Sequence, residues 1–277
     1  MTVFSKLFLY VKYHFFEVKV LNGSSLKYHL WALNRLFKYT LKGESECGYY
    51  LPLDLEVENS FGKFYLPKNT DLVLTISSKS ENNLLRYFHL ENQKGTFLDI
   101  GANAGKYSIM IGNQFPDSKI YAFEPNPTTF KILKKNIELN DLNTRVKPFN
   151  IGISDSEGKL SFSAVNQNTG LSRIVPDGEA FAGELNIIPV KSVDEIALEN
   201  SIDPKEIKLV KIDVEGHEYE VVVGAKNTFQ EMKSGSRILI EIHPNAPKKL
   251  NILETITGYG FQCQQLDIEY FIATKVK

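Results

Sequence analysis

The chain has 277 residues, of which 43% are hydrophobic and 23% charged, and its formal net charge is −1. This is the composition of an ordinary soluble globular protein with one large domain, or one domain and a small addition. The balanced charge excludes a general attraction to nucleic acid. No apolar run approaches the roughly 20 residues that span a bilayer, and the two cysteines match no metal-ligand spacing, so we expect a cytoplasmic protein.

Residues 1–43 are basic and rich in aromatic side chains, with seven lysines and arginines against the single acid Glu17. Apolar residues at helical spacing flank the turn sequence Asn22–Ser25, which predicts two amphipathic helices. These helices either cap the next domain with solvated lysines or bind peripherally to an anionic membrane or a lipid-linked carrier. Residues 55–66 alternate like a short hairpin. We therefore expect an N-terminal helical extension over residues 1–92 and the main domain over residues 93–277.

The main domain opens with a strand, a glycine loop and a helix in residues 96–111. Gly101 and Gly105 allow the backbone to turn tightly and a ligand to approach it closely. The helix begins near Asn103, so the free backbone N–H groups of its first turn lie at the carboxyl end of the sheet, where α/β folds bind ligands. Asp99 stands before the first glycine, where its carboxylate would repel a pyrophosphate but suits an ammonium group. These four residues predict a site for S-adenosylmethionine, which carries an ammonium and a sulfonium.

The next two strands supply further candidates for cofactor binding. The strand over residues 119–124 ends at Glu124, whose carboxylate can accept hydrogen bonds from both hydroxyls of a ribose. The strand over residues 145–151 leads to Asn150 and Asp155, which either contact adenine or serve as turn residues. The following polar segment, residues 163–188, is long enough to form a lid over the acceptor pocket.

The second strong motif is LVKIDVEGHE, residues 209–218, in which an apolar strand stops at Asp213. Asp213, Glu215 and His217 crowd this strand tip, with more charge than a helix N-terminus requires. The strand over residues 237–244 then brings Glu241 and His243 to the same edge of the sheet. We expect this cluster to form the acceptor side of the site.

Two chemistries fit the cluster. Either His217 or His243 acts as a general base, because an unshifted imidazole titrates near neutral pH. Alternatively, Asp213, Glu241 and His243 bind a divalent metal such as Mg²⁺ or Mn²⁺, which lowers the pKa of the acceptor hydroxyl.

The segments FLDIGANAGKYS, YAFEPNP, IGISD, KIDVEGHEYEVVVGA and ILIEIHP, within residues 96–244, resemble the FkbM family of methyltransferases. The resemblance implies an α/β fold with a Rossmann-like class I methyltransferase sheet of seven strands, the last antiparallel. It also implies methyl transfer from S-adenosylmethionine, usually to a hydroxyl of a sugar or other small molecule such as a natural product. The terminal β-hairpin predicted over residues 261–274 agrees with such a sheet.

Three other functions fit less well. A nicotinamide oxidoreductase is disfavoured by Asp99 and by the terminal hairpin. A nucleic-acid methyltransferase needs a basic channel with aromatic side chains beside its active site. The basic residues of this chain concentrate instead near the N-terminus, far from the predicted site in the sequence. No nucleic-acid partner is therefore expected. A non-catalytic Rossmann-like binding module does not account for the charged cluster over residues 213–218.

Overall fold

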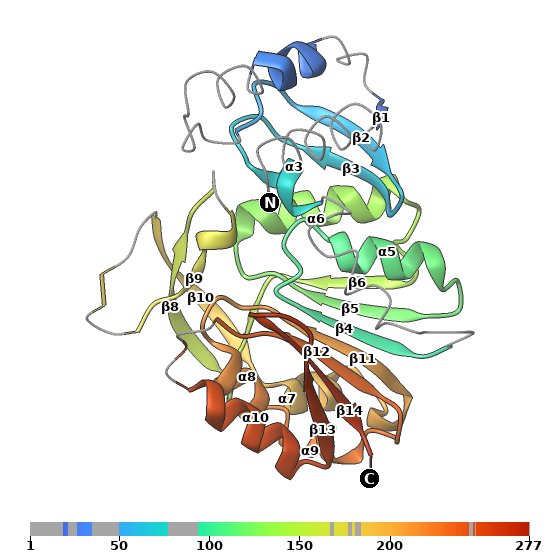
Figure 1. The fold of residues 1–277 in the computed structure, drawn as a ribbon, viewed down its shortest axis with the longest axis vertical. Coiled ribbons are helices and arrows are strands. Elements are labelled where there is room, and N and C mark those ends of the chain that lie inside the picture. Colours follow the sequence, from blue (N-terminus) through green and yellow to red (C-terminus); the bar gives the residue numbers. More distant parts are fainter. Residues whose placement is uncertain are drawn as a thin grey trace.

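The structure is a computed structural model that describes residues 19–21, 27–34, 50–76, 94–166, 169–176, 179–180, 184–243, 246 and 248–276 (Figure 1). Residues 27–34 are helical and belong to the second predicted N-terminal helix. The first predicted N-terminal helix and the domain boundary at residue 92 lie outside the described residues. Within the described part of the chain, no helix is long and apolar enough to cross a membrane.

A seven-stranded sheet forms the centre of the molecule, in the order β13-β14-β12-β11-β4-β5-β6. Adjacent strands from β12 to β6 are parallel, whereas β14 is antiparallel to both β12 and β13 and lies between them. The predicted seven-stranded sheet with an antiparallel last strand is thus confirmed. The strands are β4 (Thr96–Ile100), β5 (Lys119–Phe123), β6 (Val146–Phe149), β11 (Ile207–Ile212), β12 (Arg237–Glu241), β13 (Phe261–Gln265) and β14 (Tyr270–Lys275).

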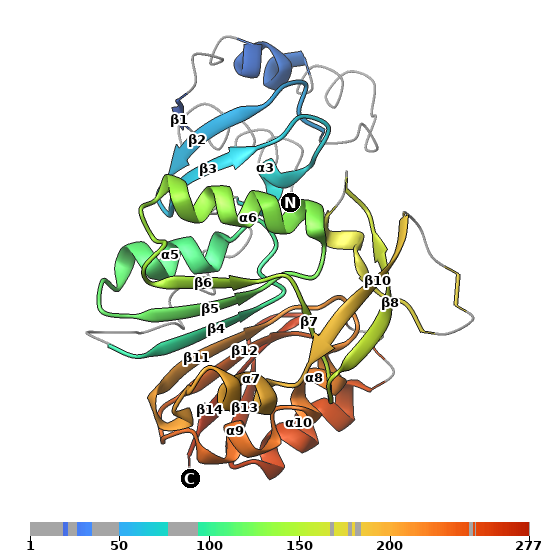
Figure 2. The same ribbon diagram turned by 180° about the vertical axis from the view of Figure 1, so that it is seen from behind.

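Helices cover both faces of this sheet, which is why its parallel strands read as nearly continuous apolar runs. On β4, Phe97 packs into the core shared with the helices of one face, and Leu98 and Ile100 pack into the core of the other. Figures 1 and 2 show the two layers from opposite sides. The first layer contains α5 (Lys106–Gln114) and α6 (Pro127–Leu139); the second contains α7 (Val193–Glu199), α8 (Glu218–Val223), α9 (Lys226–Glu231) and α10 (Lys249–Gly258), and η4 (Pro204–Glu206) precedes β11.

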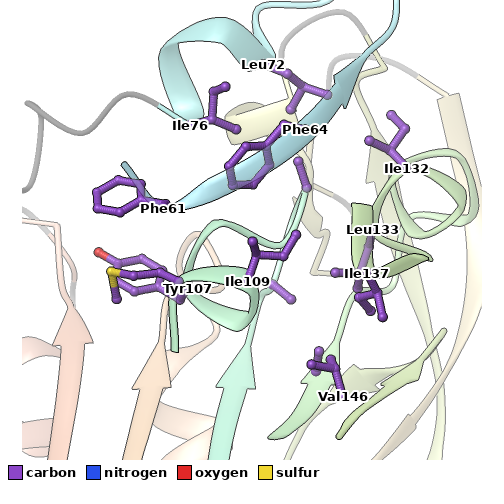
Figure 3. Packing of buried hydrophobic residues seen from close by; sticks show 14 of the residues in the cluster. Phe61, Phe64, Leu72, Ile76, Tyr107, Ile109, Ile132, Leu133, Ile137 and Val146 are labelled. Atoms are coloured by element: carbon purple, nitrogen blue, oxygen red, sulfur yellow. The ribbon is translucent and has the colours of Figure 1, made fainter. Parts of the chain in front are cut away.

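The predicted hairpin near the N-terminus is present and packs on α5 and α6 (Figure 3). Phe61 and Phe64 share one buried core with Ile109 and Leu133 of these helices. Asn136 of α6 accepts a hydrogen bond of 2.6 Å from the backbone N–H of Tyr65. The hairpin is therefore continuous with the main core. The hairpin consists of β2 (Leu55–Asn59) and β3 (Gly62–Leu66); β1 (Lys19–Val20) pairs with β2, and the short helix α3 (Leu72–Thr75) follows β3.

The polar segment expected to form a lid contributes instead to a second, four-stranded sheet with the order β7-β10-β8-β9. Phe162, Ile188 and Val190 form a small buried cluster on one face of this sheet. The sheet stands beside the main sheet in both views (Figures 1 and 2). Its elements are β7 (Gly152–Ile153), β8 (Gly158–Ala164), β9 (Arg173–Ile174) and β10 (Glu184–Lys191), with the single turn η3 (Thr169–Leu171) between β8 and β9.

Candidate active site

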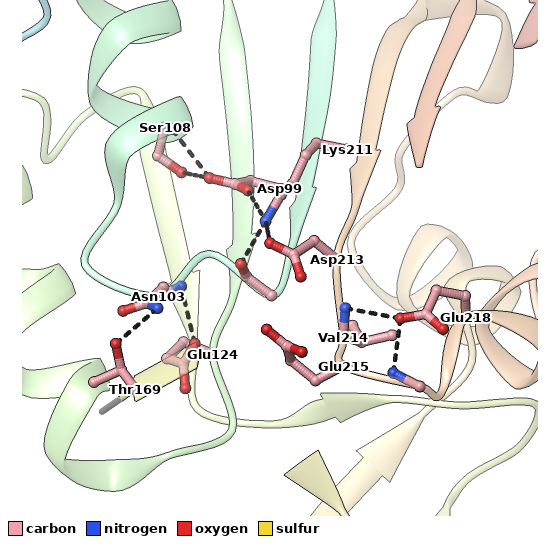
Figure 4. A network of polar contacts seen from close by, with 12 residues as sticks. Asp99, Asn103, Ser108, Glu124, Thr169, Lys211, Asp213, Val214, Glu215 and Glu218 are labelled. Atoms are coloured by element: carbon pink, nitrogen blue, oxygen red, sulfur yellow. Dashed lines mark hydrogen bonds and ion pairs between the residues drawn. The ribbon is translucent and has the colours of Figure 1, made fainter. Parts of the chain in front are cut away.

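A pocket lies at the carboxyl ends of β4, β5 and β11, the edge at which open α/β sheets bind ligands. Its polar lining includes Gly101 and Asn103 after β4, Glu124 after β5, and Asp213 and Glu215 after β11 (Figure 4). Its remaining wall is partly apolar and comes from β5, the loop before β7, and the second sheet: Phe123, Ile151, Ile153, Phe162 and Ile174. Five of the residues predicted to bind cofactor or acceptor therefore line one pocket.

The two glycines of the loop after β4 are required by their surroundings. Gly101 has a φ of 76°, and a Cβ there would lie 1.8 Å from the carbonyl oxygen of Asp213. Gly105 has a φ of 91°, and its Cβ would lie 2.7 Å from a methyl carbon of Leu133. Both backbone conformations favour glycine, so neither position accepts a side chain without rearrangement. Gly101 lines the pocket, whereas Gly105 packs against α6.

Glu124 is buried at the tip of β5 and is held by two backbone N–H groups. Its Oε2 accepts a 2.9 Å hydrogen bond from Asn103, and its Oε1 accepts one of 2.9 Å from Asn126. Burial raises the pKa of Glu124 to about 7, although both backbone hydrogen bonds lower it. Each carboxylate oxygen retains acceptor capacity, so Glu124 can receive hydroxyl donors from a ligand in the pocket.

Asp99 has partners within the protein and does not line the pocket. Its Oδ2 accepts hydrogen bonds from the backbone N–H and the hydroxyl of Ser108, at 3.0 and 2.6 Å. Its Oδ1 lies 3.9 Å from the buried ammonium of Lys211, which also pairs with Asp213 at 3.1 Å and donates to the carbonyl of Gly101 at 2.7 Å. Burial raises the pKa of Asp99, while Lys211 and Ser108 lower it.

Lys211 thus joins the loop after β4 to the loop after β11, and it was not among the residues singled out from the sequence. The available signal was a charged residue inside the apolar strand Leu209–Ile212. A buried lysine requires a charged partner, so its position next to Asp213 at the strand tip could have indicated an internal ion pair.

Glu215, which the sequence predicts to lie on the acceptor side, lines the pocket and has a φ of 54°. Strained backbone in a residue other than glycine is typical of functional sites. The side chain points into the space between Asp213 and Glu124 (Figure 4). Burial, followed by the negative charge of Asp213, raises the pKa of Glu215 to about 7.

His243 supports Glu215 from outside the pocket. Its Nε2 lies 3.1 Å from Oε2 of Glu215, and its Nδ1 lies 3.6 Å from Glu269. The hydrogen bond to Glu215 raises the pKa of His243, and half of the imidazole is exposed. The structure therefore brings His243 to the site as a partner of the carboxylate.

Three other predicted residues lie beside the pocket and connect its loops. Nε2 of His217 is 2.9 Å from the hydroxyl of Ser154, and burial lowers the pKa of the imidazole. The same hydroxyl lies 3.3 Å from Asp155, and the amide of Asn150 donates to the carbonyl of Glu124 at 2.8 Å. A direct role of His217, Asp155 or Asn150 in binding stays a prediction.

The residues proposed as metal ligands do not fit a metal site. Asp213 pairs with Lys211, and His243 contacts Glu215 and Glu269. Burial, and then the charge of Asp213, raises the pKa of Glu241 to about 7. Nowhere in the described ranges do three His, Cys, Asp or Glu side chains come together as a metal site would require. No metal-assisted step is therefore derived.

The strand order, the antiparallel β14 and the pocket with a carboxylate at the tip of the second strand define a class I S-adenosylmethionine methyltransferase fold. Residues 99–263, more than half of the chain, match the family described as the Methyltransferase FkbM domain. The chain belongs to the FkbM methyltransferase family, and the resemblance noted in the sequence is confirmed.

Several named methyltransferases are similar to this chain. Methyltransferase SdnD of Sordaria araneosa is 31% identical over 160 residues, which are 49% of this chain and 62% of that protein. Hexuronic acid methyltransferase AglP of Haloferax volcanii is 27% identical over 199 residues, covering 72% of this chain and 77% of AglP. The 2-O-methyltransferase NoeI of Sinorhizobium fredii is 24% identical over 158 residues, 52% of this chain and 63% of NoeI. The match to SdnD thus spans less than two thirds of that relative.

Proposed function

We propose that this protein transfers a methyl group from S-adenosylmethionine to a hydroxyl oxygen of a sugar or another small molecule. The observation that carries the proposal is one pocket that holds a buried acceptor for ribose hydroxyls, Glu124, opposite a carboxylate with a pKa of about 7, Glu215. The names of AglP and NoeI, a hexuronic acid methyltransferase and a 2-O-methyltransferase, support a hydroxyl acceptor.

The pocket residues fit the proposed cofactor. Glu124 offers acceptors to the two ribose hydroxyls, and the apolar wall that includes Ile151 and Phe162 suits an aromatic base. Oδ1 of Asn103 is buried and has no hydrogen-bond partner in the described part of the chain. Buried polar atoms are nearly always hydrogen-bonded, so this oxygen calls for a donor from a ligand.

Glu215 is the general base in this proposal. The cofactor, when bound, supplies a methyl group on a sulfonium that is open to in-line displacement. As the acceptor oxygen forms its new bond to carbon, its proton passes to the carboxylate of Glu215. A base with a pKa of about 7 is half ionised at neutral pH and still basic enough to take this proton. The hydrogen bond from His243 orients the carboxylate and favours its ionised form.

Isothermal titration calorimetry with S-adenosylhomocysteine tests the cofactor part of the proposal. We expect wild type to bind this ligand but not NADH, and Glu124→Ala to bind it at least about tenfold more weakly, because two hydrogen bonds are lost. Failure of wild type to bind S-adenosylhomocysteine would refute the assignment.

The base is tested on a panel of sugar and natural-product hydroxyls. Once an acceptor is found, Glu215→Gln should lower kcat by about 10²- to 10⁴-fold and leave the affinity for S-adenosylhomocysteine within about threefold of wild type. Near-native turnover of this variant would exclude Glu215 as the base and favour His217 as the general base instead.

Contact of residues 1–43 with an anionic membrane or a lipid-linked carrier, by a protein that is otherwise cytoplasmic, remains part of the proposal. It rests on the excess of lysine and arginine in this segment. Co-sedimentation with liposomes should increase with the fraction of anionic lipid. Binding that is independent of lipid charge would exclude the membrane contact.

A further inference from the structure

Three buried carboxylate or amide oxygens lack hydrogen-bond donors in the described part of the chain: Oδ1 of Asp99, which faces the ammonium of Lys211 at 3.9 Å, Oδ1 of Asn103 and Oδ1 of Asp71. The last two come from distant parts of the sequence, since Asn103 follows β4 and Asp71 directly precedes α3 beside the N-terminal hairpin. Asp71 is partly buried and its Oδ1 is fully buried, and burial raises the pKa of this carboxyl group. The pair requires an explanation that the packing of the protein does not provide.

Thr169 of η3 brings these two side chains together. Its hydroxyl accepts a 3.0 Å hydrogen bond from Nδ2 of Asn103 (Figure 4), and its backbone N–H donates to the carboxylate of Asp71. Thr169 is itself buried and lines the pocket. Because Asp71 and Asn103 both bond to one residue, their unpartnered oxygens lie in the same neighbourhood.

A ligand that fits two unpartnered acceptors is a group with several N–H donors and a positive charge. An ammonium has three donors and no acceptor, and one of the two acceptors is a carboxylate. Asp99 was expected from the sequence to bind such a group, but its oxygens face Ser108 and Lys211. Because Oδ1 of Asp99 already faces the Lys211 ammonium, the other buried acceptors without a donor in the described part of the chain are Oδ1 of Asp71 and Oδ1 of Asn103.

We propose that Asp71 and Asn103, held by Thr169, bind the α-ammonium group of the cofactor's amino-acid moiety. This inference rests on the proposed binding of S-adenosylmethionine. It assigns a cofactor contact to Asp71, which lies outside the residues 99–263 that match the family. The N-terminal hairpin and α3 then belong to the cofactor site as well as to the core.

The test compares two ligands that differ only in the ammonium group: S-adenosylhomocysteine and its deamino analogue, S-adenosyl-4-mercaptobutyrate. Asp71→Asn keeps an oxygen that can accept the N–H of Thr169 and removes the charge. We expect this variant to bind S-adenosylhomocysteine about 10- to 100-fold more weakly, as for the loss of a hydrogen bond to a charged group. Its affinity for the deamino analogue should equal that of wild type.

Asp54→Asn is the matched control. Asp54 lies in the same part of the chain and also accepts a backbone N–H, but from Lys68 at 2.8 Å, whereas the donor to Asp71 is Thr169 in the wall of the pocket. Its substitution should change neither affinity. If Asp71→Asn binds both ligands like wild type, or weakens both equally, the ammonium assignment is wrong while the cofactor assignment stands. If wild type binds neither ligand, both proposals fail.

Discussion

Replacing Lys211 with methionine should destabilise the protein strongly, because the lysine neutralises two carboxylates at once. The Lys211 side chain is 7% exposed, and its ammonium lies 3.9 Å from Asp99, whose side chain is 2% exposed, and 3.1 Å from Asp213. Removing one partner from a buried ion pair leaves an uncompensated charge and costs about 3–5 kcal/mol. For a chain of this size each kcal/mol lowers Tm by roughly 2–4 °C.

The loss should depend on pH with a definite sign. Without Lys211, the pKa of Asp99 rises further above its value in the unfolded chain, so the folded state binds the proton more tightly. Stability of the variant then improves as the pH falls through the pKa of the folded state. The deficit relative to wild type should be largest at pH 7 and above, and smaller at pH 5.

Urea unfolding followed by circular dichroism at both pH values measures this deficit. Lys233→Met is the control, since this exposed lysine pairs with Glu206 on the surface and its loss should cost no more than about 0.5 kcal/mol. The double variant Lys211→Met with Asp99→Asn should recover part of the loss, because the orphaned charge is gone. A cost below about 1 kcal/mol at pH 7, or a deficit that does not shrink at pH 5, would refute the reasoning.

Three further predictions concern the site. His243→Ala removes a hydrogen bond that lowers the pKa of Glu215, so the acidic limb of the pH profile of kcat/KM should move to higher pH; an unmoved limb would contradict the pairing. Gly101→Ala should yield little folded protein, because the added Cβ would overlap the carbonyl of Asp213. Gly216→Ala is the control: Gly216 has a φ of 104° but no atom within 4 Å of an added Cβ, so thermal unfolding should show a loss of only about 1–3 kcal/mol from backbone strain. Equal losses of stability in the two variants would argue against this account. Methyl transfer should survive exhaustive EDTA treatment, since the described residues form no group of metal-ligating side chains; loss of activity that Mg²⁺ or Mn²⁺ restores would show the opposite.

The features that the sequence predicts well are those that a short segment determines by itself. The alternation over residues 55–66 places the hairpin, and Pro127 after Asn126 marks the start of α6, where the amide of Asn126 accepts from the N–H of Thr128. The carboxyl ends of parallel strands meet at one edge, so Glu124 and Asp213 could be assigned to the same site before any coordinates.

What the sequence does not reveal is which of two neighbouring acids faces the pocket and which faces the core. Asp99 and Asp213 both stand at strand tips, yet only Asp213 lines the pocket, because Ser108 and Lys211 hold Asp99 inside the protein. Such a choice depends on side chains that meet only after the sheet has formed. The contacts of Thr169 with Asn103 and with Asp71 are equally non-local.

The position of β14 between β12 and β13 has a consequence for synthesis on the ribosome. Until residues 270–275 have emerged, β12 is an open edge whose apolar residues, among them Ile238 and Ile240, have no strand beside them on that side. The edge β13 also has no partner in the sheet before that moment, because it pairs only with β14. The nascent chain therefore carries an unpaired, aggregation-prone edge until β14 is made, and products stalled or truncated before β14 are expected to be substrates for chaperones and proteases.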